Sequence, residues 1–282
     1  MEGRFVLEYS PRHGRLPNYA APYRGFVPIG VDVVIPTFKR PEALSRCLEA
    51  LDRQTVAPTS IEVVDDSADD RGPAYSRNIG WRRGSAPVVA FTDDDCVPSE
   101  DWVASIQRHF EDAAVHGMEG SVTTVDSRGN LSDMDPNPRD RWNRFKTANM
   151  AYRRDVLEEV GGFDERYYIH REDTDLAWRV LNRGYTISWS SECVVHHPDR
   201  GGVPRVAFDS EQLLYRCDPS KYLEVAAASI SFSSIRDGSL GRARRGMRSE
   251  QKNGVPPLSR SESLSLWSRA LAKAAIRKIS GG

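Results

Sequence analysis

The fold is decided by the stretch Val88-Val89-Ala90-Phe91-Thr92-Asp93-Asp94-Asp95-Cys96-Val97-Pro98, where an apolar run stops at three adjacent carboxylates. An apolar run bounded by polar residues predicts a buried strand, and in open α/β sheets ligands gather beyond the carboxyl ends of strands. Adjacent acids repel one another and need a positive partner. A divalent cation suits them, because Mg²⁺ and Mn²⁺ prefer hard oxygen ligands. The alternative at this point is a solvated acidic turn that leads into a helix at Trp102.

Strand and helix patterns alternate on both sides of this stretch. On the N-terminal side, β-branched and apolar runs predict strands at 31–36, 61–66 and 88–91, with helices from Pro41 and over 75–83 between them. Strand, helix, strand, helix, strand at this spacing predicts a parallel sheet wound as a Rossmann-like layer. On the C-terminal side the patterns predict helices at 101–114, 155–160 and 172–182, strands at 120–125, 185–189 and 193–196, and a long loop at 126–141.

Size and composition are those of an ordinary globular protein. The 282 residues are 39% hydrophobic and 28% charged, with a formal net charge of −1, which argues against bulk nucleic-acid binding. The charge is unevenly distributed. From Arg236 onward basic residues far outnumber the acids Asp237, Glu250 and Glu262.

The cysteines and the apolar runs indicate where the protein works. Its four cysteines, Cys47, Cys96, Cys193 and Cys217, are widely spaced, which suits reduced thiols in the cytoplasm better than a disulfide framework or a zinc site. The first residues hold no continuous apolar segment of the kind found in secretory signals. No run of about 18 apolar residues predicts a membrane-spanning helix. We therefore expect a cytoplasmic protein.

Acidic clusters stand at three predicted element ends. Asp65-Asp66 and Asp93-Asp94-Asp95 follow strands, and Glu172-Asp173 opens a helix. Acids at a helix N-terminus are favourable on dipole grounds alone, by about 0.3–1 kcal/mol, so capping would explain one such cluster. Here three acidic clusters lie at element ends, which is where α/β sheets place their binding sites. This favours one shared site over capping.

An ordered set of motifs over residues 31–200 resembles family 2 glycosyltransferases of the GT-A fold. The resemblance implies an α/β fold with a Rossmann-like, mostly parallel central sheet flanked by helices. It divides the chain into an N-terminal arm (1–30), a catalytic domain (31–205, with a nucleotide-sugar half at 31–100 and an acceptor half at 101–205) and a basic, partly helical C-terminal extension (206–282). The matching motifs are 33–40 (VVIPTFKR), 63–67 (VVDDS), 76–80 (SRNIG), 91–95 (FTDDD), 161–165 (GGFDE) and 172–179 (EDTDLAWR).

The resemblance also implies roles in binding a nucleoside-diphosphate-sugar. Asp95 is implied as the direct ligand of Mn²⁺ or Mg²⁺, and Asp93 faces the ribose or a metal-bound water. The role of Asp94 is ambiguous, because three consecutive Asp residues allow the family's motif to be aligned in two registers. Asp66 would contact the base and Arg77 the diphosphate or base, where a guanidinium fork suits phosphate, unless Arg77 is simply a surface helix residue. The pocket walls would be Pro36, Thr37 and Arg40.

The acceptor side needs a base, because an incoming hydroxyl loses its proton as it attacks. In the resembling family the acidic pair supplies it, which points to Asp173, with Glu172 as the alternative, and implies inversion at the anomeric carbon. A histidine of this region supplies a third metal ligand in some relatives, so His196 or His197 could serve, although a histidine pair is more often structural. The motif QxxRW of processive members is absent, which favours single additions.

The C-terminal region carries a separate signal. Over 263–279, Leu264, Trp267, Leu271 and Ala275 fall on one helical face beside a basic stripe of Arg269, Lys273 and Arg277. Such a helix suits peripheral contact with the anionic surface on the inner face of a membrane. It equally suits packing on the catalytic domain with its basic face in water.

The sequence therefore predicts a hexosyltransferase-like enzyme of polysaccharide or glycoconjugate biosynthesis. Its acceptor would be a saccharide, a lipid-linked compound or a small molecule. Two alternatives stay open. A nucleotidyltransferase-like enzyme also needs metal-binding acids, but usually has a glycine-rich loop after the first strand, where this chain reads Pro36-Thr37-Phe38-Lys39-Arg40. A non-catalytic nucleotide-sugar-binding module would not need the complete acid set.

Overall fold

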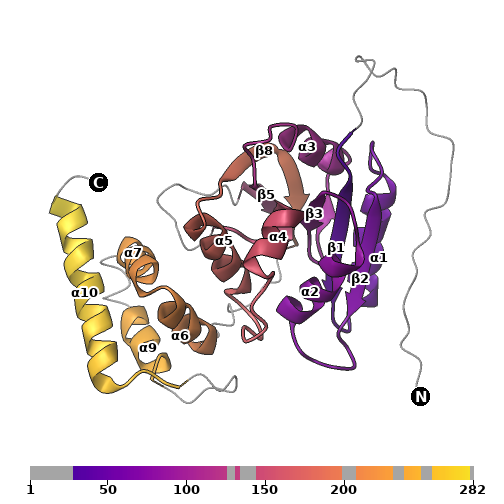
Figure 1. The fold of residues 1–282 in the computed structure, drawn as a ribbon. Coiled ribbons are helices and arrows are strands. Elements are labelled where there is room, and N and C mark those ends of the chain that lie inside the picture. Colours follow the sequence, from indigo (N-terminus) through magenta and orange to yellow (C-terminus); the bar gives the residue numbers. More distant parts are fainter. Residues whose placement is uncertain are drawn as a thin grey trace.

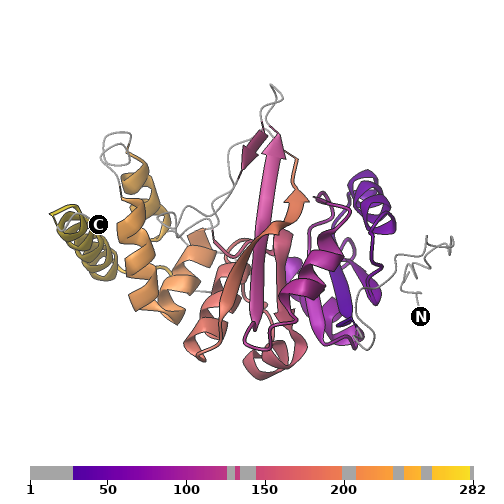
Figure 2. The ribbon, with the colours of Figure 1, turned by 90° about the horizontal axis from the view of Figure 1, so that it is seen from above.

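The strand at 88–91 lies inside a single twisted sheet (Figures 1 and 2). The computed structural model describes residues 28–125, 131–133, 144–198, 208–230, 238–248 and 256–279. Within these residues eight strands form one sheet in the order β2-β1-β3-β7-β5-β8-β4, with β6 paired to β5. The strands are β1 (Val31–Thr37), β2 (Ser60–Asp65), β3 (Val88–Phe91), β4 (Val97–Pro98), β5 (Gly117–Val125), β6 (Leu131–Asp133), β7 (Met150–Arg153) and β8 (Ile187–His196).

The strand directions confirm the predicted, mostly parallel sheet. β1 pairs in parallel with both β2 and β3, as the alternating pattern predicted. β5 and β8 are parallel to each other, and β7 joins the two groups by running antiparallel to β3 and to β5. Thus β1, β2, β3, β5 and β8 share one direction, and their carboxyl ends lie at the same edge.

Helices cover both faces of the sheet, and alternate residues of the strands supply the two interfaces. Val31, Val33 and Ile35 pack with α1 and α3 on one face, whereas Val34 and Phe91 pack with α2, α4 and α5 on the other. This period of two is what a strand buried on both faces requires. The helices are α1 (Pro41–Asp52), α2 (Pro73–Arg83), α3 (Trp102–His109), α4 (Arg154–Val160), α5 (Glu172–Asn182), α6 (Phe208–Cys217), α7 (Pro219–Ser229), α9 (Ser239–Gly246) and α10 (Arg260–Ile279), and a 3₁₀ turn covers Thr147–Asn149.

Several predicted elements differ from the observed ones. β5 begins at Gly117 rather than at residue 120, and β6 lies inside the predicted loop at 126–141. The helix predicted at 101–114 ends at His109. In the turn that follows, the Asp112 carboxylate accepts a hydrogen bond from the Ala114 amide. The two strands predicted at 185–189 and 193–196 form one strand, β8. Its pairing with β5 shifts register after Gly120, so a bulge interrupts the apolar pattern.

A buried asparagine satisfies the backbone at this bulge. The Asn149 amide donates to the carbonyl oxygens of Ser121 (2.7 Å) and Cys193 (2.8 Å). Its own oxygen accepts a hydrogen bond from the indole of Trp102 at 2.8 Å. Unpaired carbonyls in the core would be costly, so this single side chain holds β5, β8 and α3 together where the ladder is irregular.

The C-terminal helices form a third apolar cluster beside α5, on the side of the molecule away from β1 and β2 (Figure 1). α10 packs along α7, which belongs to the C-terminal extension rather than to the catalytic domain. The predicted apolar face was wrong in register. Of its four residues, Leu264, Leu271 and Ala275 are exposed and Trp267 is buried, together with Leu266, Ala270 and Ala274. Small residues at the last two positions let α10 approach its neighbour closely.

Parts of two sequence predictions lie outside the described residues. These are the N-terminal arm up to residue 27 and most of the loop at 126–141, of which only β6 is described. Among the described residues, no helix combines the length and the apolar character needed to cross a membrane.

The turn at Gly161-Gly162 fixes α4 and α5 against α2. Both glycines have positive φ, 83° and 72°. Asn78 of α2 accepts the Phe163 amide hydrogen and donates to the Phe163 carbonyl oxygen, both at 2.9 Å. Arg179 donates to the Gly162 carbonyl oxygen and to the carboxylate of Asp175, one turn earlier in α5, at 2.8 Å.

Alanine at each glycine should therefore destabilise the protein to different extents. At Gly161 an added Cβ meets no atom within 4 Å, so Gly161→Ala should cost only the left-handed conformation, about 1–2 kcal/mol. At Gly162 the Cβ would lie 2.6 Å from Asn78 Oδ1 and 2.8 Å from Trp81 Nε1. Gly162→Ala should cost about 1–3 kcal/mol more. Urea unfolding of the two variants measures the difference, and equal midpoints would contradict this account.

Candidate active site

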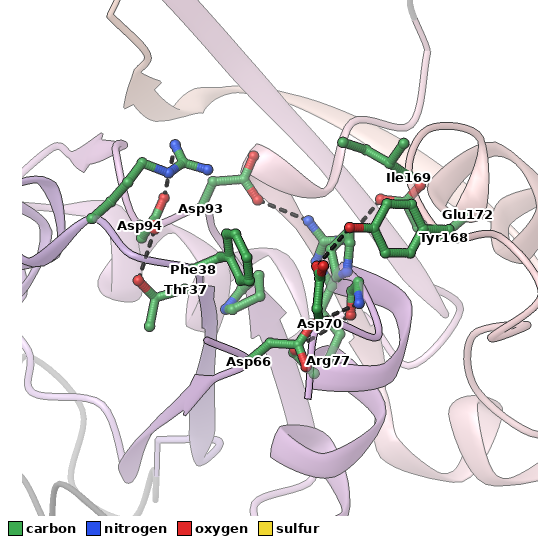
Figure 3. Close-up of a pocket in the computed structure, with 15 residues that line it drawn as sticks. Thr37, Phe38, Asp66, Asp70, Arg77, Asp93, Asp94, Tyr168, Ile169 and Glu172 are labelled. Carbon is green, nitrogen blue, oxygen red and sulfur yellow. Dashed lines mark hydrogen bonds and ion pairs between the residues drawn. The ribbon is translucent and has the colours of Figure 1, made fainter. Parts of the chain in front are cut away.

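A cavity of about 250 Å³ opens where the carboxyl ends of β1, β2 and β3 meet. In Figure 3, Thr37, Phe38 and Asp94 lie on one side of it. Tyr168, Ile169 and Glu172 lie on the other. The structure thus brings together the residues that the sequence assigned to the nucleotide-sugar, which are Pro36, Thr37, Arg40, Asp66, Arg77, Asp93 and Asp94.

Two arginines and a hydroxyl compensate the acid triplet. Arg40 Nη1 lies 3.2 Å from Asp94 and 3.0 Å from Asp95. The Thr37 hydroxyl donates to Asp94 at 2.8 Å. Arg77 Nη2 lies 2.8 Å from Asp93. Burial raises the pKa of Asp94, and the hydrogen bond from Thr37 and the charge of Arg40 oppose this shift. The positive charge that three adjacent acids require comes in part from the protein itself.

Arg77 joins the acid triplet to the acidic pair of α5. Its second terminal nitrogen, Nη1, lies 2.9 Å from Glu172, and only 3% of the residue is exposed. The alternative of a surface helix residue is therefore wrong. Burial alone would lower the pKa of Arg77, but the charges of Asp93 and Glu172 more than reverse this and raise it. A fork with several fixed donors suits this bridge better than a lysine would.

The acidic pair lies at the start of α5, with its two members in different surroundings. Glu172 is buried and lines the cavity. Burial and the neighbouring charge of Asp173 raise the pKa of Glu172, and Arg77 opposes the shift. Asp173 is half-buried, does not line the cavity, and accepts a hydrogen bond from the Thr174 amide at 2.6 Å. Glu172 therefore lies at the cavity, and Asp173 lies outside its lining.

Four side chains could contribute to a cation site next to the cavity. One potential ligand atom from each of Asp93, Asp95, Cys96 and His197 lies within 4.8 Å of the others. Burial and nearby acids raise the pKa of the Cys96 thiol well above its usual value, so it stays protonated and is a poor ligand. The set that remains is two carboxylates and an imidazole, which fits Mn²⁺ or Mg²⁺ with water completing the shell.

The two histidines face different partners. His197 Nε2 lies 3.6 Å from Asp95, and His197 Nδ1 lies 2.9 Å from the Pro198 carbonyl oxygen. A carbonyl only accepts, so Nδ1 carries the hydrogen and Nε2 keeps a lone pair for a ligand. His196 instead forms a hydrogen bond with Thr123 of β5, outside the cluster of potential ligands. Strand register decides which histidine turns inward.

Sequence reasoning missed the far wall of the cavity. Tyr168 and Ile169 line it although they are large and 45% and 44% exposed. The Tyr168 hydroxyl donates to Asp70 at 2.6 Å, which links the loop before α5 to the loop after β2. Two adjacent large side chains just before an acidic pair were the available signal, because exposed apolar groups at a cavity rim often contact ligands.

Three buried polar atoms of the cavity residues have no hydrogen-bond partner among the described residues. They are Asp66 Oδ1, Arg77 Nε and Glu172 Oε2. The other Asp66 oxygen accepts the Gly72 amide hydrogen at 2.6 Å, which fixes the carboxylate. Buried polar groups are nearly always paired, so a ligand or ordered water is expected at these atoms.

Comparison with known proteins finds similar sequences. The family model described as glycosyl transferase family 2 matches residues 68–162. Glycosyltransferase AglE of Haloferax volcanii is 25% identical over 60% of this chain and 67% of its own length. The pre-mycofactocin glycosyltransferase of Mycobacterium tuberculosis is 28% identical, over 46% of this chain but only 31% of its own length.

A solved structure shows the same fold. The S. aureus protein TarS, residues 1–349 in complex with UDP-GlcNAc, superimposes with a TM-score of 0.56 at 14% identity. The match covers 90% of this chain and 92% of that structure.

Proposed function

Because the chain is a family 2 glycosyltransferase with a GT-A fold, we propose that it transfers single sugars with inversion from a nucleoside-diphosphate-sugar to an acceptor hydroxyl, with the help of a divalent cation. One observation carries the proposal. The acids from β2, β3 and α5 surround one cavity, and Arg77 ties Asp93 to Glu172. A site split between separate surfaces would not support a displacement reaction, which needs donor and acceptor in contact.

The donor would bind with its base toward Asp66 and its diphosphate toward the acid triplet. Asp66 Oδ1 is a buried acceptor with no hydrogen-bond partner in the part of the chain that the structure describes, and it would pair with an N–H group of a nucleobase. Arg77 would stabilise the diphosphate or the base. Thr37, Arg40 and Pro36 wall the same cavity. The structurally similar protein is in complex with UDP-GlcNAc, which supports a nucleotide-sugar as the class of donor.

The cation would be held by Asp95, with Asp93 and His197 completing the protein ligands. When bound it supplies positive charge that stabilises the departing diphosphate. Arg40 already contacts Asp94 and Asp95 with 43% of its side chain exposed, so this guanidinium is available to move toward a bound phosphate. Asp94, which Thr37 holds from β1, would keep the triplet in place.

Asp173 would accept the proton of the acceptor hydroxyl. As the acceptor oxygen bonds to the anomeric carbon, the bond from that carbon to the phosphate oxygen breaks. The nucleoside diphosphate leaves with the electron pair, and the proton passes to the carboxylate. Glu172 is less available for this role, because it is buried and paired with Arg77. Attack on the face opposite the leaving group inverts the anomeric centre.

The acceptor would be a saccharide, a lipid-linked compound or a small molecule. A lipid-linked acceptor fits peripheral contact with an anionic membrane through α10, whose residues Leu264, Leu271 and Ile276 are exposed beside Arg269. The nucleotidyltransferase alternative makes a different prediction about products. Glycosyl transfer releases a nucleoside diphosphate, whereas nucleotidyl transfer releases pyrophosphate.

A thermal-shift panel tests the proposed function. UDP, GDP and dTDP are each added with Mn²⁺, and one of them should raise the melting temperature. A specific ligand at 100 times its dissociation constant stabilises the folded state by about 2.7 kcal/mol. The same nucleotide with EDTA in place of Mn²⁺ should give a smaller shift. The absence of a shift with every diphosphate would contradict the proposal.

A further inference from the structure

The loop before the acidic pair has an unfavourable backbone conformation. His170 and Arg171 are consecutive non-glycine residues with φ of 72° each. Side chains make this left-handed region costly, so such residues persist only where their surroundings hold them. Arg171 directly precedes α5, and Ile169 walls the cavity. The strained residues therefore lie between the donor pocket and the proposed base.

A buried glutamate from the C-terminal extension holds both strained residues. Arg171 Nε donates to Glu211 of α6 at 2.6 Å, and His170 Nε2 lies 3.3 Å from the same carboxylate. The Tyr222 hydroxyl of α7 donates to its other oxygen at 2.8 Å. Only 7% of Glu211 is exposed, so these charge-assisted contacts are shielded from water.

A second contact fixes the loop at the next position back. The Ser210 hydroxyl, also from α6, donates to the Ile169 carbonyl oxygen at 2.7 Å. Burial raises the pKa of Glu211, but Arg171 and the hydrogen bonds from His170 and Tyr222 outweigh this and lower it to about 2. The carboxylate of Glu211 is thus charged throughout the range in which an enzyme works.

We propose that Glu211 is a positioning residue, through which the C-terminal extension holds the loop 169–171 in its left-handed conformation and so places the acidic pair of α5 against the donor pocket. The inference rests on the proposed function, since it concerns the orientation of Glu172 and Asp173. Glu211 lines no part of the donor cavity, so its effect on the reaction passes through the loop.

The fold does not depend on this carboxylate alone. Trp178 of α5 packs with Leu213, Leu214 and Tyr222 in the apolar cluster of the C-terminal helices. These contacts join α6 and α7 to α5 without Glu211. Glu211→Gln, which nearly conserves volume, should leave the cluster folded and release the loop.

The test compares kcat with nucleotide affinity. In Glu211→Gln, kcat should fall by about 10- to 100-fold, because small displacements of catalytic groups cost on the order of 10²-fold. The dissociation constant of the nucleoside diphosphate identified in the thermal-shift panel should change by less than about threefold, since the β1, β2 and β3 ends that hold it are untouched. Glu224→Gln is the matched control. This carboxylate of α7 pairs with Lys273 at 3.3 Å near the surface and should leave kcat unchanged.

Two double variants separate positioning from folding. Arg171→Gly and Arg171→Ala, each added to Glu211→Gln, both remove the side chain, but only glycine adopts positive φ without cost. The glycine variant should recover at least about fivefold in kcat over the alanine variant. Equal kcat values for the two, or a kcat of Glu211→Gln within twofold of the unmodified protein, would overturn the inference. If the unmodified protein transfers no sugar, the proposed function fails instead.

Discussion

Asp95→Asn is expected to lower sugar transfer on the order of 10³-fold while leaving the fold intact. Asparagine keeps the shape of the side chain but removes a charge from the cluster with Asp93 and His197, where one potential ligand atom from each side chain lies within 4.8 Å of the others. Without that charge the cation is held weakly, and the charge on the departing diphosphate is poorly stabilised. Initial rates over a range of Mn²⁺ concentrations measure the effect.

The measurement has an internal readout and a matched control. Mn²⁺ should no longer enhance the thermal shift given by the nucleoside diphosphate in the Asp95→Asn variant. Glu192→Gln is the control. The Glu192 carboxylate is 77% exposed, and its ion pair with Arg108 is long at 3.7 Å, so this variant should keep full activity. Undiminished transfer by Asp95→Asn, with an unchanged response to Mn²⁺, would show that the cation does not depend on this residue.

Asp173→Asn is expected to lower kcat by about 10²–10⁴-fold, the range found when a general base is removed. An amide cannot take up the proton of the acceptor hydroxyl at neutral pH. Asparagine can still accept the hydrogen bond from the Thr174 amide, so the first turn of α5 should remain intact. Turnover with saturating donor and acceptor measures kcat, and the affinity for the nucleoside diphosphate should stay within about threefold.

Glu172→Gln distinguishes the two candidate bases. Glu172 pairs with Arg77 at 2.9 Å, so its amide variant should weaken nucleotide binding and loosen Arg77 as well as slow transfer. Asp173→Asn should affect kcat alone. If instead Glu172→Gln lowers kcat at unchanged nucleotide affinity and Asp173→Asn retains turnover, the assignment of the base must be reversed.

Residue patterns predicted which acids gather at the ends of β2 and β3, because this part of the cavity is built from strand ends. Apolar runs that stop at Asp66 and Asp93 place both residues at one edge once β1, β2 and β3 are parallel, and the structure confirms this arrangement. No such pattern indicated that Arg77 joins Asp93 to Glu172. That contact joins residues 95 positions apart in the chain, which local periodicity does not reveal.

The features that could not be predicted depend on packing between distant elements. In the sequence Tyr168 is an ordinary aromatic residue, and only the folded structure brings its hydroxyl to Asp70. The left-handed residues before α5 carry no glycine or asparagine that would signal their conformation, because Glu211 of another helix imposes it. The apolar face of α10 was misassigned because Leu266, rather than Leu264, packs inward. In each case tertiary contacts outweigh local propensity.

The bridge made by Arg77 has a consequence for dissecting the protein into pieces. A fragment limited to residues 68–162, the segment that the family model matches, would keep the guanidinium and one of its two anions but lose Glu172. Removing one member of a buried ionic group typically costs about 3–5 kcal/mol. Recombinant halves cut between α4 and α5 should therefore aggregate or stay unfolded until they are mixed. The part of the chain proposed to recognise the donor should not fold on its own.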